Sequence, residues 1–168
     1  FMYGLSTTLF FLGFTYVFLL EKARYLNHFY LVSLVGLLMI FVPAQRLFSM
    51  DARRRPRIVS ETVPAWPLWL LRGQMGIVYF FGGVAKLNGD WLRGYPMRRW
   101  LPKHNDFPII GSLFDEPAMA LLFSWGGLLI DLSAVPFLLW QRTRMHAFLA
   151  LVGFQLMNAQ LFSLGIFP

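Results

Sequence analysis

The sequence lacks cysteine altogether and has few charged residues for its length. Without cysteine the chain has no disulfide, no thiolate metal ligand and no thiol nucleophile. Charged residues make up 14% of its 168 residues, well below the roughly one quarter that is usual in soluble domains. The three histidines are scattered, and no histidine or carboxylate spacing is typical of a zinc site. The composition therefore argues against an ordinary soluble domain and gives no sign of a metal centre.

Long hydrophobic runs dominate what is present, because 57% of the residues are hydrophobic. The runs are 1–20, 29–42, 66–87, 117–140 and 145–168. Most approach the ~20 residues that a helix needs to cross the hydrocarbon core, whereas the second is shorter and could be tilted, partly buried or re-entrant. The pattern predicts an all-α fold, a polytopic membrane helix bundle of about five transmembrane helices. Because the chain begins and ends inside apolar runs, we expect 1–168 to be one membrane domain, truncated at both ends, of a longer protein.

The net charge of +7 comes from basic residues in the connections between the runs. Nucleic-acid binding would favour a continuous basic stripe with interleaved aromatic residues, so anionic lipid headgroups are the expected partners. If all five runs span the membrane, 21–28 and 88–116 lie on one side, and 43–65 and 141–144 on the other. The arginines within 53–57 favour the second side as cytoplasmic. The alternation also places His28 and Lys86 on the same side.

Three charged residues fall inside the predicted spans, where a charge needs a partner, a cavity or a route to the interface. They are Arg72, Lys86 and Asp131. When the third and fourth runs are laid between the same two membrane surfaces, Arg72 and Asp131 come to similar depths. We interpret these two as a structural ion pair between the helices, in which the loss of one partner would leave the other charge uncompensated.

The third run carries small and polar residues on one helical face. They recur at spacings of three and four, at Arg72, Met75, Gly76, Tyr79, Gly82, Gly83 and Lys86. The opposite side, which includes Ile77, Phe81 and Val84, is apolar and suits lipid or packed neighbours. The glycines allow the close approach of another helix or of a flat ring. We expect the polar face to contact protein or ligand.

Lys86 allows two interpretations because it lies near the end of its run. A lysine in that position commonly extends its amine to the lipid headgroups. Alternatively, the turn Leu87-Asn88-Gly89-Asp90-Trp91 folds back over the helix end and shields the amine. Removal from water disfavours the ammonium form, so a shielded lysine can act as a neutral base.

Other polar residues of the spans are open to similar alternatives. Gln155, Asn158 and Gln160 in the fifth run are either interhelical hydrogen-bonding groups or ligand contacts. His28, with Asn27 and Tyr30, begins the second run, where an isolated histidine is usually a solvated interfacial residue.

Three ordered segments carry a resemblance to a known family. They are Asn27-His28-Phe29-Tyr30, the stretch 72–97 with its sequence Gly82-Gly83-Val84-Ala85-Lys86-Leu87-Asn88-Gly89-Asp90-Trp91, and Met157-Asn158-Ala159-Gln160-Leu161-Phe162-Ser163-Leu164-Gly165. These segments resemble the membrane domain of vitamin K-dependent gamma-glutamyl carboxylase and its bacterial relatives, the horizontally transferred transmembrane domain family. The stretch 126–134, which contains Asp131, supports the resemblance, and the similarity covers 26–168.

The resemblance implies a membrane lyase that couples oxygen-dependent epoxidation of reduced vitamin K, a menaquinol- or phylloquinol-type hydroquinone, to the carboxylation of protein glutamate by carbon dioxide. Lys86 would deprotonate the hydroquinone, and His28 and Asn27 would hydrogen-bond the quinone oxygens or the oxyanion. The further residues expected at the cofactor are Tyr30, Tyr79, Gly82, Gly83, Asn158 and Gln160. The implied partners are the lipid bilayer, the lipophilic quinol and a protein or peptide glutamate. The implied location is the inner membrane of a bacterium or the endoplasmic reticulum of a eukaryote.

Three departures from the family pattern accompany the resemblance. Ala85-Lys86 stands where the animal enzyme has two adjacent lysines, so Lys86 is the sole candidate base. Gln155 stands where many relatives carry a histidine, and an amide cannot titrate. The large extramembrane portion of the carboxylase is absent from this sequence.

Two other functions stay open at this point. The first is a non-catalytic membrane scaffold of the same family, acting as a toxin-immunity or maturation partner. The second is a quinone-binding subunit of a respiratory complex, although no haem-ligand histidine pair favours it.

Overall fold

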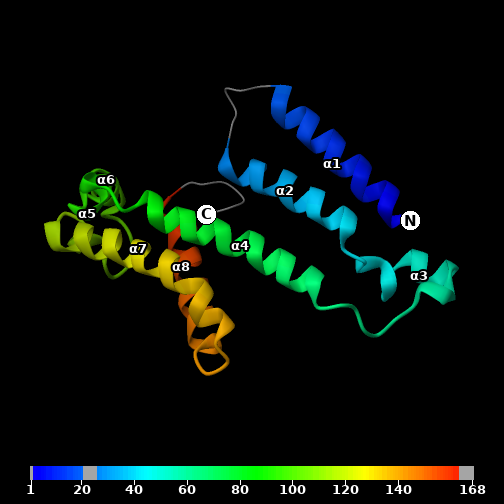
Figure 1. The fold of residues 1–168 in the computed structure, drawn as a ribbon. Coiled ribbons are helices and arrows are strands. Elements are labelled where there is room, and N and C mark those ends of the chain that lie inside the picture. Colours follow the sequence, from blue (N-terminus) through cyan, green and yellow to red (C-terminus); the bar gives the residue numbers. More distant parts are fainter. Residues whose placement is uncertain (1, 21–25, 163–168) are drawn as a thin grey trace. The chain divides into compact units, whose positions relative to one another are not determined.

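A computed structural model describes residues 2–20 and 26–162, and the regular elements among them are all helical (Figure 1). The five longer helices are α1 (Tyr3–Leu20), α2 (Asn27–Phe41), α4 (Trp66–Ala85), α7 (Pro117–Leu139) and α8 (Arg144–Leu161). The shorter ones are α3 (Met50–Arg54), α5 (Gly89–Leu92) and α6 (Tyr95–Trp100), with 3-10 turns at Ala44–Arg46, Pro56–Ile58, Leu101–His104 and Gly111–Leu113. The all-α prediction is confirmed, and each of the five longer helices overlaps one of the predicted runs.

Three of these helices, α1, α4 and α7, are long and apolar enough to cross a membrane. Helix α2 is apolar but has 15 residues. Helix α8 has 18 residues, and the amides and basic side chains within it make it less apolar than the other three. A bundle containing membrane-spanning helices is therefore supported, whereas the spanning of α2 and α8 stays a prediction.

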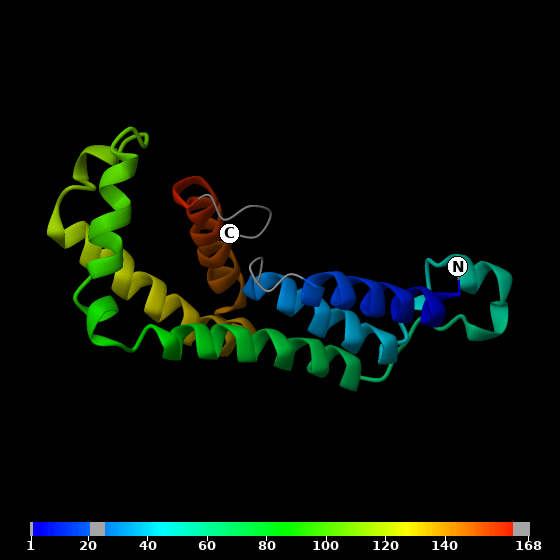
Figure 2. The ribbon, with the colours of Figure 1, turned by 90° about the horizontal axis from the view of Figure 1, so that it is seen from above.

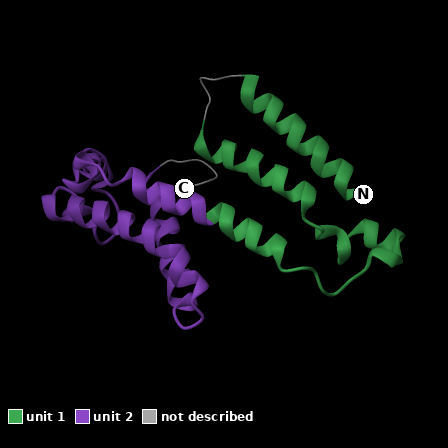
Figure 3. Cartoon of the chain, viewed as in Figure 1, with its two compact units in different colours: residues 1–75 green, residues 76–168 purple. Residues whose placement is uncertain are grey.

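The described residues form two compact units, 1–75 and 76–168, and α4 runs from the first into the second (Figure 3). In the first unit α1 packs alongside α2, as Figures 1 and 2 both show. The edge of the Phe14 ring meets Phe29 with 6.1 Å between ring centroids, and Gly36 lets the ring of Phe10 approach the backbone of α2. Apolar packing thus holds this pair together. That 1–168 forms one membrane domain stays a prediction.

The start of α1 is capped by a carboxylate from α3. The backbone N–H groups of Met2 and Tyr3 donate to Asp51 at 2.8 and 2.5 Å. The first N–H groups of a helix have no partner within it, and the helix dipole favours a negative charge there. Asp51 therefore ties α3 to the beginning of α1.

Acid is expected to loosen this cap. The hydrogen bonds from Tyr3 and Met2 hold the pKa of Asp51 below its ordinary value of 3.8. A carboxyl whose pKa is depressed by folding contributes stability that is present above its unfolded pKa and lost as the pH falls through the folded one. The protection of the Met2 and Tyr3 amides, measured as their exchange rate relative to an unstructured peptide at the same pH, should fall below about pH 4, and Asp51→Asn should lower this protection at neutral pH too. Exchange that is the same in both proteins at pH 7 would show that the carboxylate does not cap α1.

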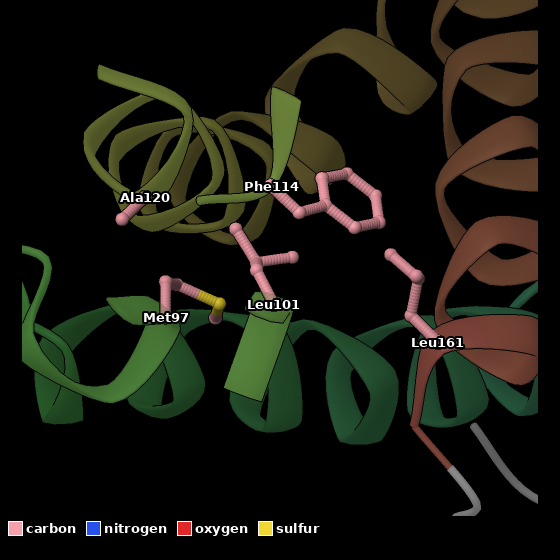
Figure 4. Close-up of a cluster of buried hydrophobic side chains, with 5 residues drawn as sticks. All are labelled: Met97, Leu101, Phe114, Ala120 and Leu161. Carbon is pink, nitrogen blue, oxygen red and sulfur yellow. The ribbon is translucent and has the colours of Figure 1, made fainter. Parts of the chain in front are cut away.

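The second unit contains a folded region where the sequence predicted only a connection. Helices α5 and α6 pack along the first half of α7, and α7 and α8 form a hairpin. Met97 and Leu101 turn toward Phe114, Ala120 and Leu161 in a buried apolar cluster (Figure 4). Gly94 begins α6 with a φ of 74°, and a Cβ there would lie 3.3 Å from the backbone of Ala120. This residue therefore needs to be glycine for both its conformation and its close approach to α7.

The predicted polar face of α4 packs against α7 within the second unit. A Cβ on Gly83 would lie 2.5 Å from Cδ2 of Leu132, and one on Gly76 would lie 3.6 Å from Val135. Ile77, Phe81 and Val84 on the opposite side are exposed, as expected of a lipid-facing surface. The sequence allowed either another helix or a flat ring to pack against the glycines of α4, and in the structure a helix, α7, packs there.

Gly83→Ala is expected to destabilise the protein by about 1–3 kcal/mol, the usual cost of forcing an extra methyl group into a packed interface. Gly126 is the matched control, because it also lies inside a helix that packs with α4 and a Cβ on it would meet nothing within 4 Å. Gly126→Ala should leave stability unchanged or raise it slightly. Unfolding titrations in mixed micelles of increasing sodium dodecyl sulfate measure both. Equal effects of the two substitutions would contradict the close α4–α7 contact.

Candidate functional site

Lys86 and Asp131 form an ion pair in the second unit. Lys86 directly follows the last residue of α4, and its Nζ lies 2.5 Å from Oδ2 of Asp131 on α7. The same amine donates to the backbone carbonyl of Gly82 at 3.3 Å. The side chains of Lys86 and Asp131 are 24% and 12% exposed. The amine is thus turned back along α4 and toward α7.

The position of Asp131 along α7 places the pair well inside this helix. The 14 residues of 117–130 precede it, which at 1.5 Å per residue is about 20 Å of helix. Helices α5 and α6 pack beside this part of α7. Lys86 therefore does not extend to the lipid headgroups at the start of α7. The structure agrees with the other interpretation, in which the amine is shielded.

The predicted ion pair between Arg72 and Asp131 is wrong. Asp131 pairs with Lys86, whereas the guanidinium of Arg72 lies 5.2 Å from the centroid of the Trp69 ring. Arg72 precedes Lys86 by about 20 Å along α4. The prediction assumed that α4 and α7 begin and end at the same two membrane surfaces. In the structure Asp131 lies level with Gly82, because a Cβ on Gly82 would be 3.2 Å from Oδ2 of Asp131. Helices α5 and α6 pack beside α7 ahead of this level, at Ser124 and Ala120.

The turn after α4 folds back over the amine. Asn88 donates through Nδ2 to the carbonyl of Ala85 at 2.8 Å and accepts from the backbone N–H of Trp91 at 2.9 Å. The Trp91 indole donates to the carbonyl of Ser124 at 2.7 Å. These bonds hold the indole ring 5.2 Å from Nζ of Lys86, a distance suited to a cation–π contact. The predicted shielding turn is confirmed.

A second polar contact of the α4 face lies two turns before Lys86. Gln155 of α8 donates through Nε2 to the hydroxyl of Tyr79 at 3.5 Å, and its Oε1 is buried without a partner among the described residues. Whichever way the amide is turned, one of its two polar atoms stays unpaired. Gln155 therefore bridges two helices and also retains an unused hydrogen-bonding group.

A comparison with known protein families identifies the family of this chain. The model of the HTTM domain matches residues 1–168. The chain belongs to the HTTM domain family. HTTM is the membrane domain of vitamin K-dependent gamma-glutamyl carboxylase-like proteins, so the resemblance drawn from the three motifs is confirmed, and the chain is an integral membrane protein. No solved structure matches this HTTM domain.

The remaining predicted site residues of this HTTM domain are divided between the two units. Asn27, His28 and Tyr30 lie in the first turn of α2, in the first unit. The His28 ring meets Phe29 edge-on with 4.6 Å between centroids. The meeting of these residues with Lys86 of the second unit stays a prediction.

In the second unit of the HTTM domain, Gly82 and Gly83 lie against α7 close to the ion pair. Asn158 and Gln160 lie in the last turn of α8, where Gln160 is exposed. Contacts of these residues with a cofactor stay predictions.

Sequence reasoning missed two residues beside Lys86. Asp131 was recognised as a charge inside the spans but given the wrong partner. Trp91 was included in the turn after α4, but the contact of its ring with the amine was not predicted. Ser124, whose hydroxyl is fully buried without a partner among the described residues, gave no signal at all.

Proposed function

We propose that this HTTM domain is a multi-pass membrane enzyme that oxidises a lipophilic hydroquinone of the vitamin K class, with Lys86 as the group that takes the hydroxyl proton. The observation that carries the proposal is the Lys86–Asp131 pair, which lies about 20 Å along a membrane-crossing helix. Ionisable residues at such depth are expensive and generally functional. A purely structural contact between α4 and α7 would not need them.

The pair provides a way to generate a neutral amine. Transfer of one proton from Nζ to Oδ2 of Asp131, across their existing hydrogen bond, turns an ammonium and a carboxylate into an amine and a carboxylic acid. Lys86 can then accept the hydroxyl proton of the substrate, while Asp131 retains the proton it received. The new ammonium lies beside the oxygen that lost its proton and offsets its charge.

The hydrogen-bonding groups and the ring near Lys86 also suit a hydroquinone. An ammonium has three N–H donors, of which Asp131 and Gly82 take two, so one can reach a ligand oxygen. Gln155 of α8, which has one unpaired amide atom, contacts the Tyr79 hydroxyl. Tyr79 lies on the same face of α4 as Lys86 and precedes it by about 10 Å along the helix. The Trp91 ring beside the amine suits a flat aromatic body. When bound, the hydroquinone supplies the electrons and the acidic hydroxyl.

The finer assignments belong to the same proposal. Oxygen is the expected oxidant, and a base formed during oxidation would remove a γ-proton from a protein or peptide glutamate. Carbon dioxide would then bond to the resulting carbanion, as in a lyase of the carboxylase type. His28 and Asn27 would hydrogen-bond the quinone oxygens. We place the protein in the bacterial inner membrane or the endoplasmic reticulum, where such quinols dissolve.

Membranes containing the full-length protein test the proposal. They are supplied with reduced vitamin K, oxygen and labelled bicarbonate, and both the quinone epoxide and the fixed label are measured. We expect epoxide that depends on protein, quinol and oxygen, and label in protein if glutamate is carboxylated. A protein that forms no epoxide but co-purifies stoichiometrically with a toxin or a maturation substrate would instead be the scaffold. A protein that consumes quinol only within a purified respiratory complex would be a subunit of that complex.

A further inference from the structure

A second polar site lies on the helices that follow α4, in the second unit. The cavity there has a volume of about 590 Å³ and is lined by Asp90, Tyr95, Pro96, Arg99, Trp100 and Lys103. Neither the lysine–aspartate pair nor the Tyr79–Gln155 contact contributes to it. The cavity therefore needs a separate explanation.

The two sides of α6 explain how the cavity is built. Met97 of α6 and Leu101, the first residue of the 3-10 turn that follows it, point into the buried apolar cluster (Figure 4) and so fix the orientation of this segment. Tyr95 and Arg99 are four residues apart on α6 and share a different face of that helix, and Lys103 follows in the 3-10 turn. Burial of the first pair therefore presents the second set to the cavity.

The aromatic walls of the cavity are held by neighbours. The guanidinium of Arg98 lies 5.9 Å from the centroid of the Tyr95 ring. The Trp100 ring meets the Phe162 ring edge-on, with 5.7 Å between centroids. The two rings are thus positioned by contacts that leave their polar atoms available. Tyrosine and tryptophan with one apolar and one wet end are typical of the membrane interface.

The charges in the cavity include both signs. Arg99 and Lys103 provide two cations and Asp90 one carboxylate, and none of the three forms an ion pair within 2–20 and 26–162. Arginine and lysine together are suited to phosphate oxygens, and a carboxylate is suited to an ammonium group. A ligand that carries a phosphate and an ammonium a few atoms apart would satisfy all three.

We propose that this cavity binds the phosphoethanolamine headgroup of a membrane lipid, with the phosphate at Arg99 and Lys103 and the ammonium at Asp90. Asp90 is five residues beyond Ala85, the last residue of the membrane-crossing helix α4, so the chain reaches the cavity directly from a membrane-spanning segment. Soluble phosphoethanolamine has the same chemistry, but a lipid is already concentrated beside the site. The bound lipid would fix α6 at the bilayer surface, independently of quinol oxidation.

Native mass spectrometry of the full chain from nanodiscs tests the proposal. The nanodiscs contain equal amounts of phosphatidylethanolamine, phosphatidylcholine and phosphatidylglycerol. We expect phosphatidylethanolamine to be retained preferentially, and Arg99→Gln/Lys103→Gln to lower its retention at least fivefold. Asp90→Asn should shift the preference toward phosphatidylglycerol, because the partner of the ammonium is lost. Arg93→Gln is the control, since Arg93 is exposed on the same segment but does not line the cavity, and its lipid retention should match that of the wild type.

Several results would overturn the proposal. Equal retention of the three lipids by the wild type would exclude headgroup selection. Unchanged retention in the Arg99→Gln/Lys103→Gln protein would exclude this cavity as the site, and circular dichroism of that variant establishes that it has folded. Soluble phosphoethanolamine that binds the detergent-solubilised protein at micromolar concentration, with no lipid retained, would identify a soluble ligand instead.

Discussion

Lys86→Met is expected to lower quinol-dependent epoxide formation at least about 100-fold, because proton transfer by a positioned side chain contributes 10²–10⁴-fold to a rate. Methionine keeps the length and apolar character of the lysine stem but cannot accept a proton. Initial rates in membranes, corrected for the amount of protein by immunoblot, measure the effect. A variant that retains more than a tenth of the wild-type rate would show that Lys86 is not the base.

A second variant separates chemistry from folding. Lys86→Met alone leaves the carboxylate of Asp131 buried without its counter-charge, and misfolding could then account for lost activity. Lys86→Met/Asp131→Leu removes both charges, and replacing a buried ion pair by apolar side chains of similar volume is often neutral for stability. The double variant should be folded and as inactive as the single one. Recovery of activity in the double variant would assign the loss to the stranded carboxylate.

Asp131→Asn is expected to lower the free energy of unfolding by about 3–5 kcal/mol, the cost of stranding one charge of a buried pair. The amide keeps the shape of the carboxylate but leaves the ammonium of Lys86 uncompensated. Unfolding titrations with sodium dodecyl sulfate in mixed micelles measure the change, and Asp106→Asn, at an exposed carboxylate, is the control. A change below about 0.5 kcal/mol, the range usual for surface substitutions, would contradict a buried pair.

The same titrations test the corrected pairing. Residues in direct contact show coupling energies of 0.5–3 kcal/mol in double-mutant cycles, whereas distant residues are additive. Asp131→Asn should therefore couple to Lys86→Met and be additive with Arg72→Gln. Coupling to Arg72 and not to Lys86 would restore the ion pair that the sequence suggested.

Periodicity predicted much of the fold because it reflects local geometry. Each of the five hydrophobic runs overlaps a helix, and the spacing of Gly76 and Gly83 identified the face of α4 that packs against α7. The exposed Ile77 and Phe81 confirm the opposite face. These inferences needed only the 3.6-residue repeat of one helix and the absence of a side chain on glycine.

The offset between α4 and α7 could not be predicted in the same way. Periodicity within a helix carries no information on its depth relative to another, so the partner of Asp131 was misassigned. The folding of 88–116 was also not predicted, because Met97 and Leu101 are buried there although they alternate with Tyr95, Arg98 and Arg99. In such short helices too few turns are present for an apolar face to be recognised.

The central claim, that the amine of Lys86 is held by Asp131 within the bilayer and serves a quinol, can be measured directly. The chain has three lysines, so solid-state NMR of the protein in lipid, with ¹⁵N in lysine Nζ and ¹³C in aspartate Cγ, resolves each amine. We predict that one lysine nitrogen is dipolar-coupled to an aspartate carboxyl carbon, that Asp131→Asn removes this coupling, and that reduced vitamin K shifts the resonance. A Lys86 nitrogen with no such coupling, exchanging freely with water and unaffected by the quinol, would contradict the account.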